Sequence, residues 1–265
     1  MKVTFDTNTF HKVTKPEVYA KDPYTQAMAT IHDMIKGGKV VGYISDTMIT
    51  LEGVKRANRA SVFGGSRVLS QITHSGDTSY INMKLEQPDR QPVHAKQKER
   101  FLDAFGLGMK LLGAPRIGMP RAEECFYAQE DPTKLGDRLD RFGTILREIE
   151  GRGLGAARAK AIAARFSSRG TFSGPWFLPL GAAKDIHEEQ EVARAIAEWA
   201  DGDSIAAHYA YQNDVFCTLD HALAEERRGE PAIFAATNKA WLTSELGIKF
   251  ATIVELAGIL EAESR

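Results

Sequence analysis

Residues 2–8 have the sequence KVTFDTN, and this segment decides the fold. Polar and apolar side chains alternate from Lys2 to Phe5, which predicts a short buried strand. Asp6 comes directly after that run and begins a polar turn. The segment therefore predicts a strand of a buried sheet with a carboxylate at its C-terminal end.

The next fifty residues repeat this order of elements. Apolar residues recur at helical spacing over residues 22–36, before a pair of glycines, and residues 39–44 have the composition of a strand. Ser45 or Asp46 is suited to cap a following helix that reaches about residue 57 and carries Glu52. The order strand, helix, strand, helix predicts an α/β fold, a parallel twisted sheet flanked by helices.

The same alternation returns near the C-terminus. The predicted elements are a helix at 186–199, a second helix that starts at Asp201-Gly202-Asp203 and reaches residue 211, an apolar strand-like run at 215–219, a helix at 237–246, a strand at 248–251 and a helix at 252–261. Asp220 directly follows the strand-like run. We expect residues 1–58 and 183–265 to form two halves of one α/β domain.

Residues 59–182 have a different pattern and are predicted to be a mostly helical insertion. Segments 67–73 and 78–87 flank the turn residues HSGD and predict a β-hairpin. Helices are predicted at 95–112, 135–150 and 154–166. The hairpin suits two roles that the sequence does not separate, gripping a strand of nucleic acid or forming a homodimer.

Composition restricts the function classes. With 265 residues and 43% hydrophobic content the chain can bury a large core, so a disordered protein is not expected. The formal net charge is −1, so nucleic-acid binding has to come from local clusters of cations. One such cluster, within residues 151–169, contains no acid and comprises Arg152, Arg158, Lys160, Arg165 and Arg169. It suits either a phosphate-binding face or an ordinary solvated helix surface.

The sequence also bears on location. Asp6 interrupts the apolar run at the N-terminus, so no secretion signal is expected, and no apolar stretch is long enough to cross a bilayer, so no membrane association is expected. Cys125 and Cys217 are far apart and lack the spacing of metal ligands, which favours a reducing compartment. A cytoplasmic protein is the expectation.

Four acids occupy positions that matter in such a fold. Asp6 and Asp220 follow strands, where ligand sites of open α/β sheets form, while Glu52 and Asp203 lie on predicted helices beside the same edge. Taken singly, each acid is also explained as a turn, a helix cap or a solvated residue. Four carboxylates in one small volume repel one another unless hard cations neutralise them, which predicts a Mg²⁺ or Mn²⁺ site.

Two polar residues beside these acids are predicted to support them. Asn8 and Thr218 are placed to orient the carboxylates by hydrogen bonds or to position a metal-bound water. A pair of such ions activates water and stabilises the leaving oxygen during cleavage of a phosphodiester. The four acids therefore predict hydrolysis without a covalent protein intermediate.

The segments that carry these acids resemble the PIN-domain nucleases, a family that includes the toxin ribonucleases of toxin–antitoxin pairs. The similar segments are VTFDTN (3–8), ISDTMITLE (44–52), DSIAAHYA (203–210), VFCTLD (215–220) and GIKFATIVEL (247–256). The resemblance covers about the first 58 and last 80 residues and implies a metal-dependent endonuclease that acts on RNA. It also implies a cognate antitoxin or other inhibitor protein as a partner. Compact members place the second and third acids much closer together than the 203 − 52 = 151 positions found here.

Three other functions compete with an RNA nuclease. A nuclease acting on structured DNA would use the same acids, with the insertion shaping the substrate channel. A catalytically silent module would bind RNA or a protein through the insertion. A phosphatase with Asp6 as nucleophile ranks last, because Asn8 stands where that chemistry needs a second Asp.

Overall fold

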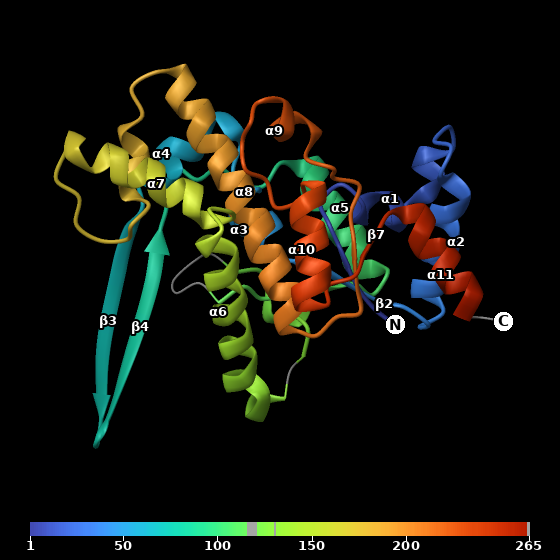
Figure 1. Cartoon of the computed structure of the whole chain (residues 1–265). Helices are drawn as coiled ribbons and strands as arrows, with labels where there is room; N and C mark the ends of the chain where they lie inside the picture. Colours follow the sequence, from blue (N-terminus) through green and yellow to red (C-terminus); the bar gives the residue numbers. More distant parts are fainter. Residues whose placement is uncertain (116–120, 130, 264–265) are drawn as a thin grey trace.

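A five-stranded parallel sheet forms the centre of the molecule. The structure, a computed structural model, describes residues 1–115, 121–129 and 131–263. The strands are β1 (Lys2–Phe5), β2 (Val41–Ser45), β5 (Lys110–Leu112), β6 (Val215–Cys217) and β7 (Phe250–Ala251). Their order is β5-β2-β1-β6-β7, and every neighbouring pair is parallel. The α/β class and the parallel sheet flanked by helices are confirmed (Figure 1).

Alternating side chains of the strands point to opposite faces of this sheet. Val3, Phe5 and Cys217 belong to a core on one face, whereas Phe216 belongs to a core on the other. The first core is completed by α1 (Phe10–Thr14), α2 (Thr25–Lys36), α5 (Ala95–Gly106) and α11 (Ile253–Glu263). The second is completed by α6 (Leu135–Gly151), α8 (Ile186–Ala210) and α10 (Ala236–Leu246).

A third core lies away from the sheet, where α8 extends past it. There α4 (Arg59–Gly64), α7 (Ala156–Phe166) and the first half of α8 pack around Phe63, Phe166 and Trp199. A hairpin of β3 (Arg67–Ser75) and β4 (Thr78–Glu86) projects from this part of the molecule (Figure 1).

The remaining elements are short. They are the helices α3 (Thr47–Thr50) and α9 (Leu223–Arg227), and 3-10 turns at Pro16–Tyr19, Arg56–Asn58, Glu124–Phe126, Pro132–Lys134, Ser167–Arg169 and Leu178–Ala182. Over the described part of the chain, none of the helices combines the length and apolar character that crossing a membrane requires.

Most predicted elements are confirmed, including the first strand and the hairpin, but some helices differ in extent, and two of them end earlier than predicted. The helix predicted at 95–112 ends at Gly106, because Gly108 adopts a left-handed conformation with φ of 99° that interrupts it. Residues 110–112 then form β5. The helix expected to carry Glu52 stops at Thr50, so Glu52 lies in the turn that follows.

The two helices predicted at 186–199 and 203–211 are one helix, α8, of 25 residues. Gly202 does not begin a new element. A Cβ atom at Gly202 would lie 2.8 Å from the Cα of Gly155, so this glycine permits close contact with the chain between α6 and α7. Asp203 is therefore in the middle of a helix and not at its start.

The insertion predicted at residues 59–182 is not confirmed as a separate unit. Residues 59–182 contribute β5, which pairs in parallel with β2, so one strand of the central sheet comes from within that segment. The predicted domain ranges include residues 116–120, 130, 264 and 265, which lie outside the described residues.

Candidate active site

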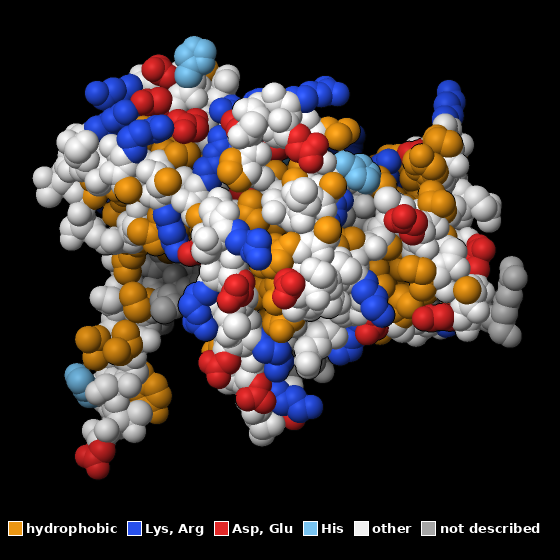
Figure 2. Space-filling view, viewed as in Figure 1, with side chains coloured by type: hydrophobic (Ala, Val, Ile, Leu, Met, Phe, Trp, Pro, Cys, Tyr) orange, Lys and Arg blue, Asp and Glu red, His pale blue; other side chains and the backbone are white. Residues whose placement is uncertain are grey.

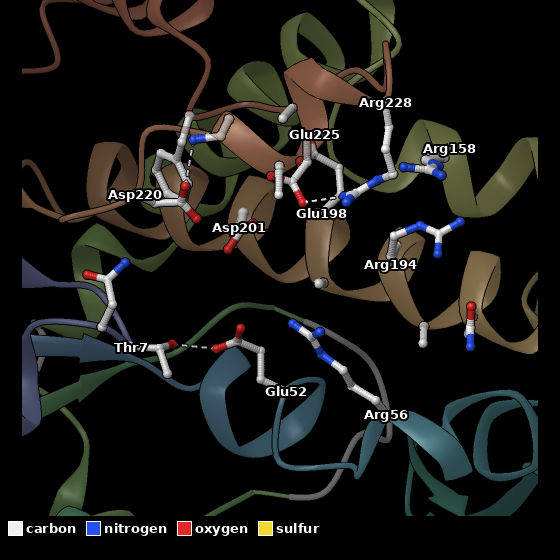
Figure 3. Close-up of a pocket in the computed structure, with 18 of the residues that line it drawn as sticks. Thr7, Glu52, Arg56, Arg158, Arg194, Glu198, Asp201, Asp220, Glu225 and Arg228 are labelled. Carbon is white, nitrogen blue, oxygen red and sulfur yellow. Dashed lines mark hydrogen bonds and ion pairs between the residues drawn. The ribbon is translucent and has the colours of Figure 1, made fainter.

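A cavity of about 870 Å³ opens at the edge of the sheet where β1 and β6 end. Its lining includes four carboxylates from four separate segments: Asp6 after β1, Glu52 after α3, Asp201 on α8 and Asp220 after β6. We call these the acid cluster. Figure 3 shows Asp201 and Asp220 on one side of this cavity, across from Thr7 and Glu52.

Asp6 is the most thoroughly fixed member of the acid cluster. Its Oδ1 accepts a hydrogen bond from the Thr7 backbone N–H at 2.7 Å, and its Oδ2 accepts from Asn8 Nδ2 at 2.8 Å and Thr218 Oγ1 at 2.7 Å. Burial nevertheless raises the pKa of Asp6 to about 7, and the neighbouring charges of Glu52 and Asp220 add to the rise. Asn8 and Thr218 thus make the hydrogen bonds to the Asp6 carboxylate that the sequence predicted.

Asp220 is held by the turn that follows β6. Its Oδ1 accepts a hydrogen bond from the Ala222 backbone N–H at 2.7 Å, and its own N–H donates to Thr218 Oγ1 at 3.0 Å. Thr218 therefore links Asp6 and Asp220 through one hydroxyl. Lys239 from α10 donates to the Asp220 backbone carbonyl at 2.6 Å and places a cation beside the pair.

Glu52 faces Asp6 from the other side of β1. The Thr7 hydroxyl donates to Glu52 Oε2 (Figure 3), so Thr7 binds two of the acids, Asp6 through its backbone N–H and Glu52 through its side chain. Burial raises the pKa of Glu52, while the Thr7 hydrogen bond and the charges of Arg59 and Arg56 oppose that rise. Glu52 is thus a partly desolvated carboxylate with cations on its far side.

Asp201 completes the acid cluster from α8. Burial raises its pKa well above the ordinary value, and the charges of Glu52, Asp6, Glu198 and Asp220 raise it further. The repulsion is mutual, since Asp220 also raises the pKa of Asp6 and of Glu52. Such clusters of desolvated acids with shifted pKa values are characteristic of functional sites.

Asp203, the acid predicted from the sequence to be the third of the site, is not in the cavity lining. The residue is 3% exposed, and its carboxylate accepts a hydrogen bond from Trp199 Nε1 at 3.2 Å, one helical turn earlier. Two residues that are two positions apart on an α-helix are rotated by about 200° around the helix axis, so their side chains project from nearly opposite sides. Asp201 therefore lies where Asp203 was expected, and the site assignment is corrected to Asp201.

The donor chemistry of the acid cluster suits a hard divalent cation. Mg²⁺ and Mn²⁺ prefer carboxylate oxygens, and a cation here would relieve the repulsion that raises these pKa values. Within the described ranges, no three His, Cys, Asp or Glu side chains already stand close enough to form a metal-ligand group. The four acids therefore fit the charge and the ligand type of such an ion without forming a closed ligand shell.

Arginines line the other end of the same cavity. Arg158, Arg194 and Arg228 converge on the single carboxylate of Glu230, at 2.8, 3.1 and 3.0 Å. These three cations lower the pKa of Glu230 to about 2. Arg228 also pairs with Glu225 at 2.8 Å, which leaves this group with one more cation than anion.

Arg56 stands between the two ends of the cavity. Figure 3 shows its side chain extending toward Glu52, so that its guanidinium group faces the acid cluster. The side chain is exposed, and no described residue forms a hydrogen bond or ion pair with it. Arg56 is therefore a cation available to a bound anion next to the acid cluster.

The basic cluster predicted within residues 151–169 does not form a single face. Lys160, Arg165 and Arg169 are paired with Glu150, Glu191 and Glu188, and Arg152 lies over the ring of Trp241. Helix α7 ends at Phe166, so Arg169 does not continue its surface. Of the five cations, only Arg158 lines the cavity.

Sequence reasoning missed Asp201, Arg56 and Glu198. Glu198 is 6% exposed and accepts hydrogen bonds from the Gly155 and Ile233 backbone N–H groups, and its burial raises its pKa to about 7. One signal for Asp201 was present, because the apolar stripe at 192, 196 and 199 continues to 203 at helical spacing and leaves 201 on the opposite side.

Comparisons with protein-family models, with curated proteins and with solved structures found no match for this chain. The resemblance to PIN-domain nucleases therefore stays a prediction that depends on the motif residues alone.

Proposed function

We propose that this chain is a divalent-metal-dependent endonuclease that hydrolyses phosphodiester bonds in RNA. The observation that carries the proposal is the convergence of Asp6, Glu52, Asp201 and Asp220 on one cavity, with burial and mutual repulsion raising the pKa values of the first three. A protein gains nothing in stability by gathering desolvated acids, so their grouping favours a function.

The acid cluster would hold Mg²⁺ or Mn²⁺. A bound divalent ion lowers the pKa of a water ligand and neutralises charge that develops on phosphate oxygens. Asn8 and Thr218 keep the Asp6 carboxylate in one orientation, and Thr7 does the same for Glu52. Thr218 also couples Asp6 to the Asp220 turn.

The arginines would bind the substrate. Arg56 lies beside the acid cluster without an internal partner among the described residues, so it is placed to contact a phosphate next to the scissile one. The excess cation of the Arg158, Arg194 and Arg228 group would attract the strand farther along the cavity. RNA as substrate, and a cognate inhibitor protein as partner, follow from the motif resemblance.

The test compares the purified protein with Asp6→Asn and Asp33→Asn on structured and unstructured RNA with Mg²⁺, Mn²⁺ or EDTA. Asp33 is an exposed acid on α2 that does not line the cavity, so its variant is the matched control. We expect metal-dependent cleavage by wild type and Asp33→Asn and none by Asp6→Asn. Equal cleavage by all three would refute the assignment.

Branched DNA added as a competitor separates the two nuclease hypotheses. If RNA is the substrate, its cleavage should persist in excess branched DNA. Strong inhibition together with cleavage of the DNA would instead identify a nuclease of structured DNA. No cleavage of either nucleic acid, with undiminished RNA binding by Asp6→Asn, would identify a silent binding module.

A further inference from the structure

Thr7 binds three residues of the cavity, each through a different polar group. Its backbone N–H donates to Asp6 Oδ1 at 2.7 Å, and its hydroxyl donates to Glu52 Oε2. Its backbone carbonyl accepts a hydrogen bond from His11 Nδ1 at 3.0 Å. His11 lines the same cavity as the two acids. The position of the imidazole is therefore fixed relative to the acid cluster through a single residue.

The hydrogen bond to Thr7 decides which nitrogen of His11 carries the proton. A carbonyl oxygen only accepts, so Nδ1 is the donor of the neutral ring and Nε2 keeps a lone pair. Nε2 is the nitrogen farther from the backbone, and among the described residues it has no hydrogen-bond partner. His11 therefore brings an available hydrogen-bond acceptor to the cavity wall.

The His11 ring is neutral near pH 7. Burial lowers the pKa of His11 to about 4, and the positive charge of Arg100 contributes to the fall. An effective catalytic acid or base titrates near the working pH, so such a ring suits neither role. Mg²⁺ and Mn²⁺ prefer oxygen ligands to imidazole. Acceptance of a hydrogen bond is the role that suits His11 best.

Arg100 of α5 lines the cavity beside His11. Its side chain is half-buried, and within the described part of the chain it forms no hydrogen bond or ion pair. On the face shown in Figure 2, Lys and Arg side chains are interspersed with Asp and Glu and form no continuous basic patch. Binding of a phosphate therefore depends on individual arginines of the cavity, and Arg100 is one of them.

A neutral acceptor beside a cation fits a ribonucleotide. The 2′-hydroxyl of ribose is a hydrogen-bond donor on the carbon next to the one that carries the 3′-phosphate, and deoxyribose has no donor there. A 2′-hydroxyl that donates to His11 Nε2 would bring the adjacent phosphate into the part of the cavity that Arg100 lines. The two side chains together match two neighbouring groups of RNA, of which DNA has only one.

We propose that His11 selects RNA by accepting a hydrogen bond from a ribose 2′-hydroxyl of the bound strand, while Arg100 binds the adjacent phosphate. This role rests on the RNA substrate of the proposed function and adds the group that distinguishes RNA from DNA. No bond is made or broken at His11, so it determines specificity without acting as an acid or a base. An acceptor placed for a hydroxyl disfavours a ligand that lacks one, because the acceptor is then left without a partner.

Single 2′-fluoro substitutions in an RNA substrate test this role, since fluorine keeps the RNA-like sugar conformation but cannot donate a hydrogen bond. We expect wild type to cleave about tenfold more slowly when one particular nucleotide near the cleaved bond is modified. In His11→Asn, whose amide can still donate to the Thr7 carbonyl, modification of that nucleotide should have no such effect. His32→Asn is the matched control and should behave as wild type. His32 also bonds a backbone carbonyl through Nδ1, that of Val13 at 3.1 Å, but it does not line the cavity.

Fluorescence anisotropy in an Asp6→Asn background measures recognition without cleavage. RNA with 2′-fluoro at every nucleotide should bind at least about tenfold more weakly than unmodified RNA, and His11→Asn should reduce this difference by about tenfold. Arg100→Ala should weaken the binding of both by about tenfold and leave their ratio unchanged, because a phosphate contact does not read the sugar. Circular dichroism verifies that each variant keeps its fold.

Two outcomes would overturn the role of His11 and leave the nuclease proposal intact. One is a wild-type protein that cleaves RNA with no effect of any single 2′-fluoro group. The other is a His11→Asn protein that cleaves every modified and unmodified RNA more slowly by the same factor, which would make His11 a structural residue. If the protein does not cleave RNA but its preference for the 2′-hydroxyl depends on His11, the selection holds and the nuclease proposal fails. A protein that neither cleaves nor binds RNA refutes both.

Discussion

Asp201 and Asp203 leave the same helix in opposite directions. Asp201 faces the cavity that Asp6, Glu52 and Asp220 also line, whereas Asp203 accepts a hydrogen bond from Trp199 Nε1 within the third core. Two acids separated by one glycine therefore have different surroundings, one shared with other carboxylates and one with an aromatic ring. We expect their substitutions to separate activity from stability.

Asp201→Asn should lower RNA cleavage by on the order of a hundredfold or more, because it removes a ligand of the proposed site. Without metal, the variant should be at least as stable as wild type. The substitution removes a buried carboxylate that the neighbouring acids repel. Cleavage rates and urea unfolding measure the two effects. A variant with full activity would place Asp201 outside the site.

Asp203→Ala should lower the stability of the protein and leave RNA cleavage nearly unchanged. The substitution removes a buried carboxylate and its hydrogen bond with the Trp199 indole N–H, and should lower the free energy of unfolding by about 1–3 kcal/mol. Cleavage measured well below the melting temperature should stay within a few-fold of wild type. Loss of cleavage with unchanged stability would restore Asp203 as the third acid.

The residues of β1 and β6 show what the sequence could predict. Alternation from Lys2 to Phe5 identified β1, and the apolar run before Asp220 identified β6, because strands in a buried parallel sheet are read from local pattern. Asp6 and Asp220 follow these strands immediately. Their convergence was thus predictable from topology alone, without knowledge of the helices.

Residues on helices were harder to place because their direction depends on packing. Gly202 was predicted to be a boundary between two helices. It lies instead within α8, where the absence of a side chain permits close contact with Gly155. This error placed Asp203 in the first turn of a new helix. It also hid the fact that residues 201 and 203 are about 200° apart around the axis of one helix. Likewise, the partners of Arg165 and Arg169 lie on α8, at Glu191 and Glu188, and no local pattern reveals such pairs.

Divalent metal should stabilise the protein through the acid cluster. A ligand at a hundred times its Kd adds about 2.7 kcal/mol to the free energy of unfolding. Mg²⁺ or Mn²⁺ should therefore raise the melting temperature of wild type and of Asp33→Asn, and EDTA should reverse the rise. Asp6→Asn/Asp220→Asn should melt at the same temperature with and without metal.

The metal effect should also depend on pH. Protons compete with the cation for a carboxylate whose pKa is about 7, so stabilisation by metal should be full above pH 7 and should fall as the pH drops below it. Calorimetric melting at pH 5, 6, 7 and 8 measures this dependence. Stabilisation that is as large at pH 5 as at pH 8 would show that the ion binds elsewhere.

Arg56→Ala should weaken RNA binding by about tenfold, the loss expected for one phosphate contact at low salt, and should reduce the salt dependence of binding. Arg165→Ala is the control, because Arg165 is exposed, pairs with Glu191 and does not line the cavity. Fluorescence anisotropy with the Asp6→Asn protein measures affinity without cleavage. If Arg165→Ala weakens binding more than Arg56→Ala does, the strand follows α7 instead of the cavity.

Glu198 should make the metal-free protein less stable as the pH rises from about 4.5 to about 7. Its pKa in the native state is about 7, against 4.5 for an ordinary glutamate, mainly because the side chain is buried. In this window the native protein retains a proton that the unfolded chain has released. The free energy of unfolding should therefore fall with pH by about 1.4 kcal/mol per unit, or about 3 kcal/mol in all.

Glu198→Gln tests this assignment with little change in structure. The amide oxygen can keep the position of Oε1, which accepts from the Gly155 and Ile233 N–H groups at 3.0 and 3.1 Å. The variant removes one ionisation, so its unfolding free energy in EDTA should decline less steeply than that of wild type, while Glu245→Gln, at an exposed position on α10, should match wild type. The pKa values of Asp6 and Asp201 are also raised in the native protein. The unfolding free energy of Glu198→Gln should therefore still fall with pH, but less than that of wild type. Parallel profiles for Glu198→Gln and wild type would mean that Glu198 has the same pKa in the native protein as in the unfolded chain.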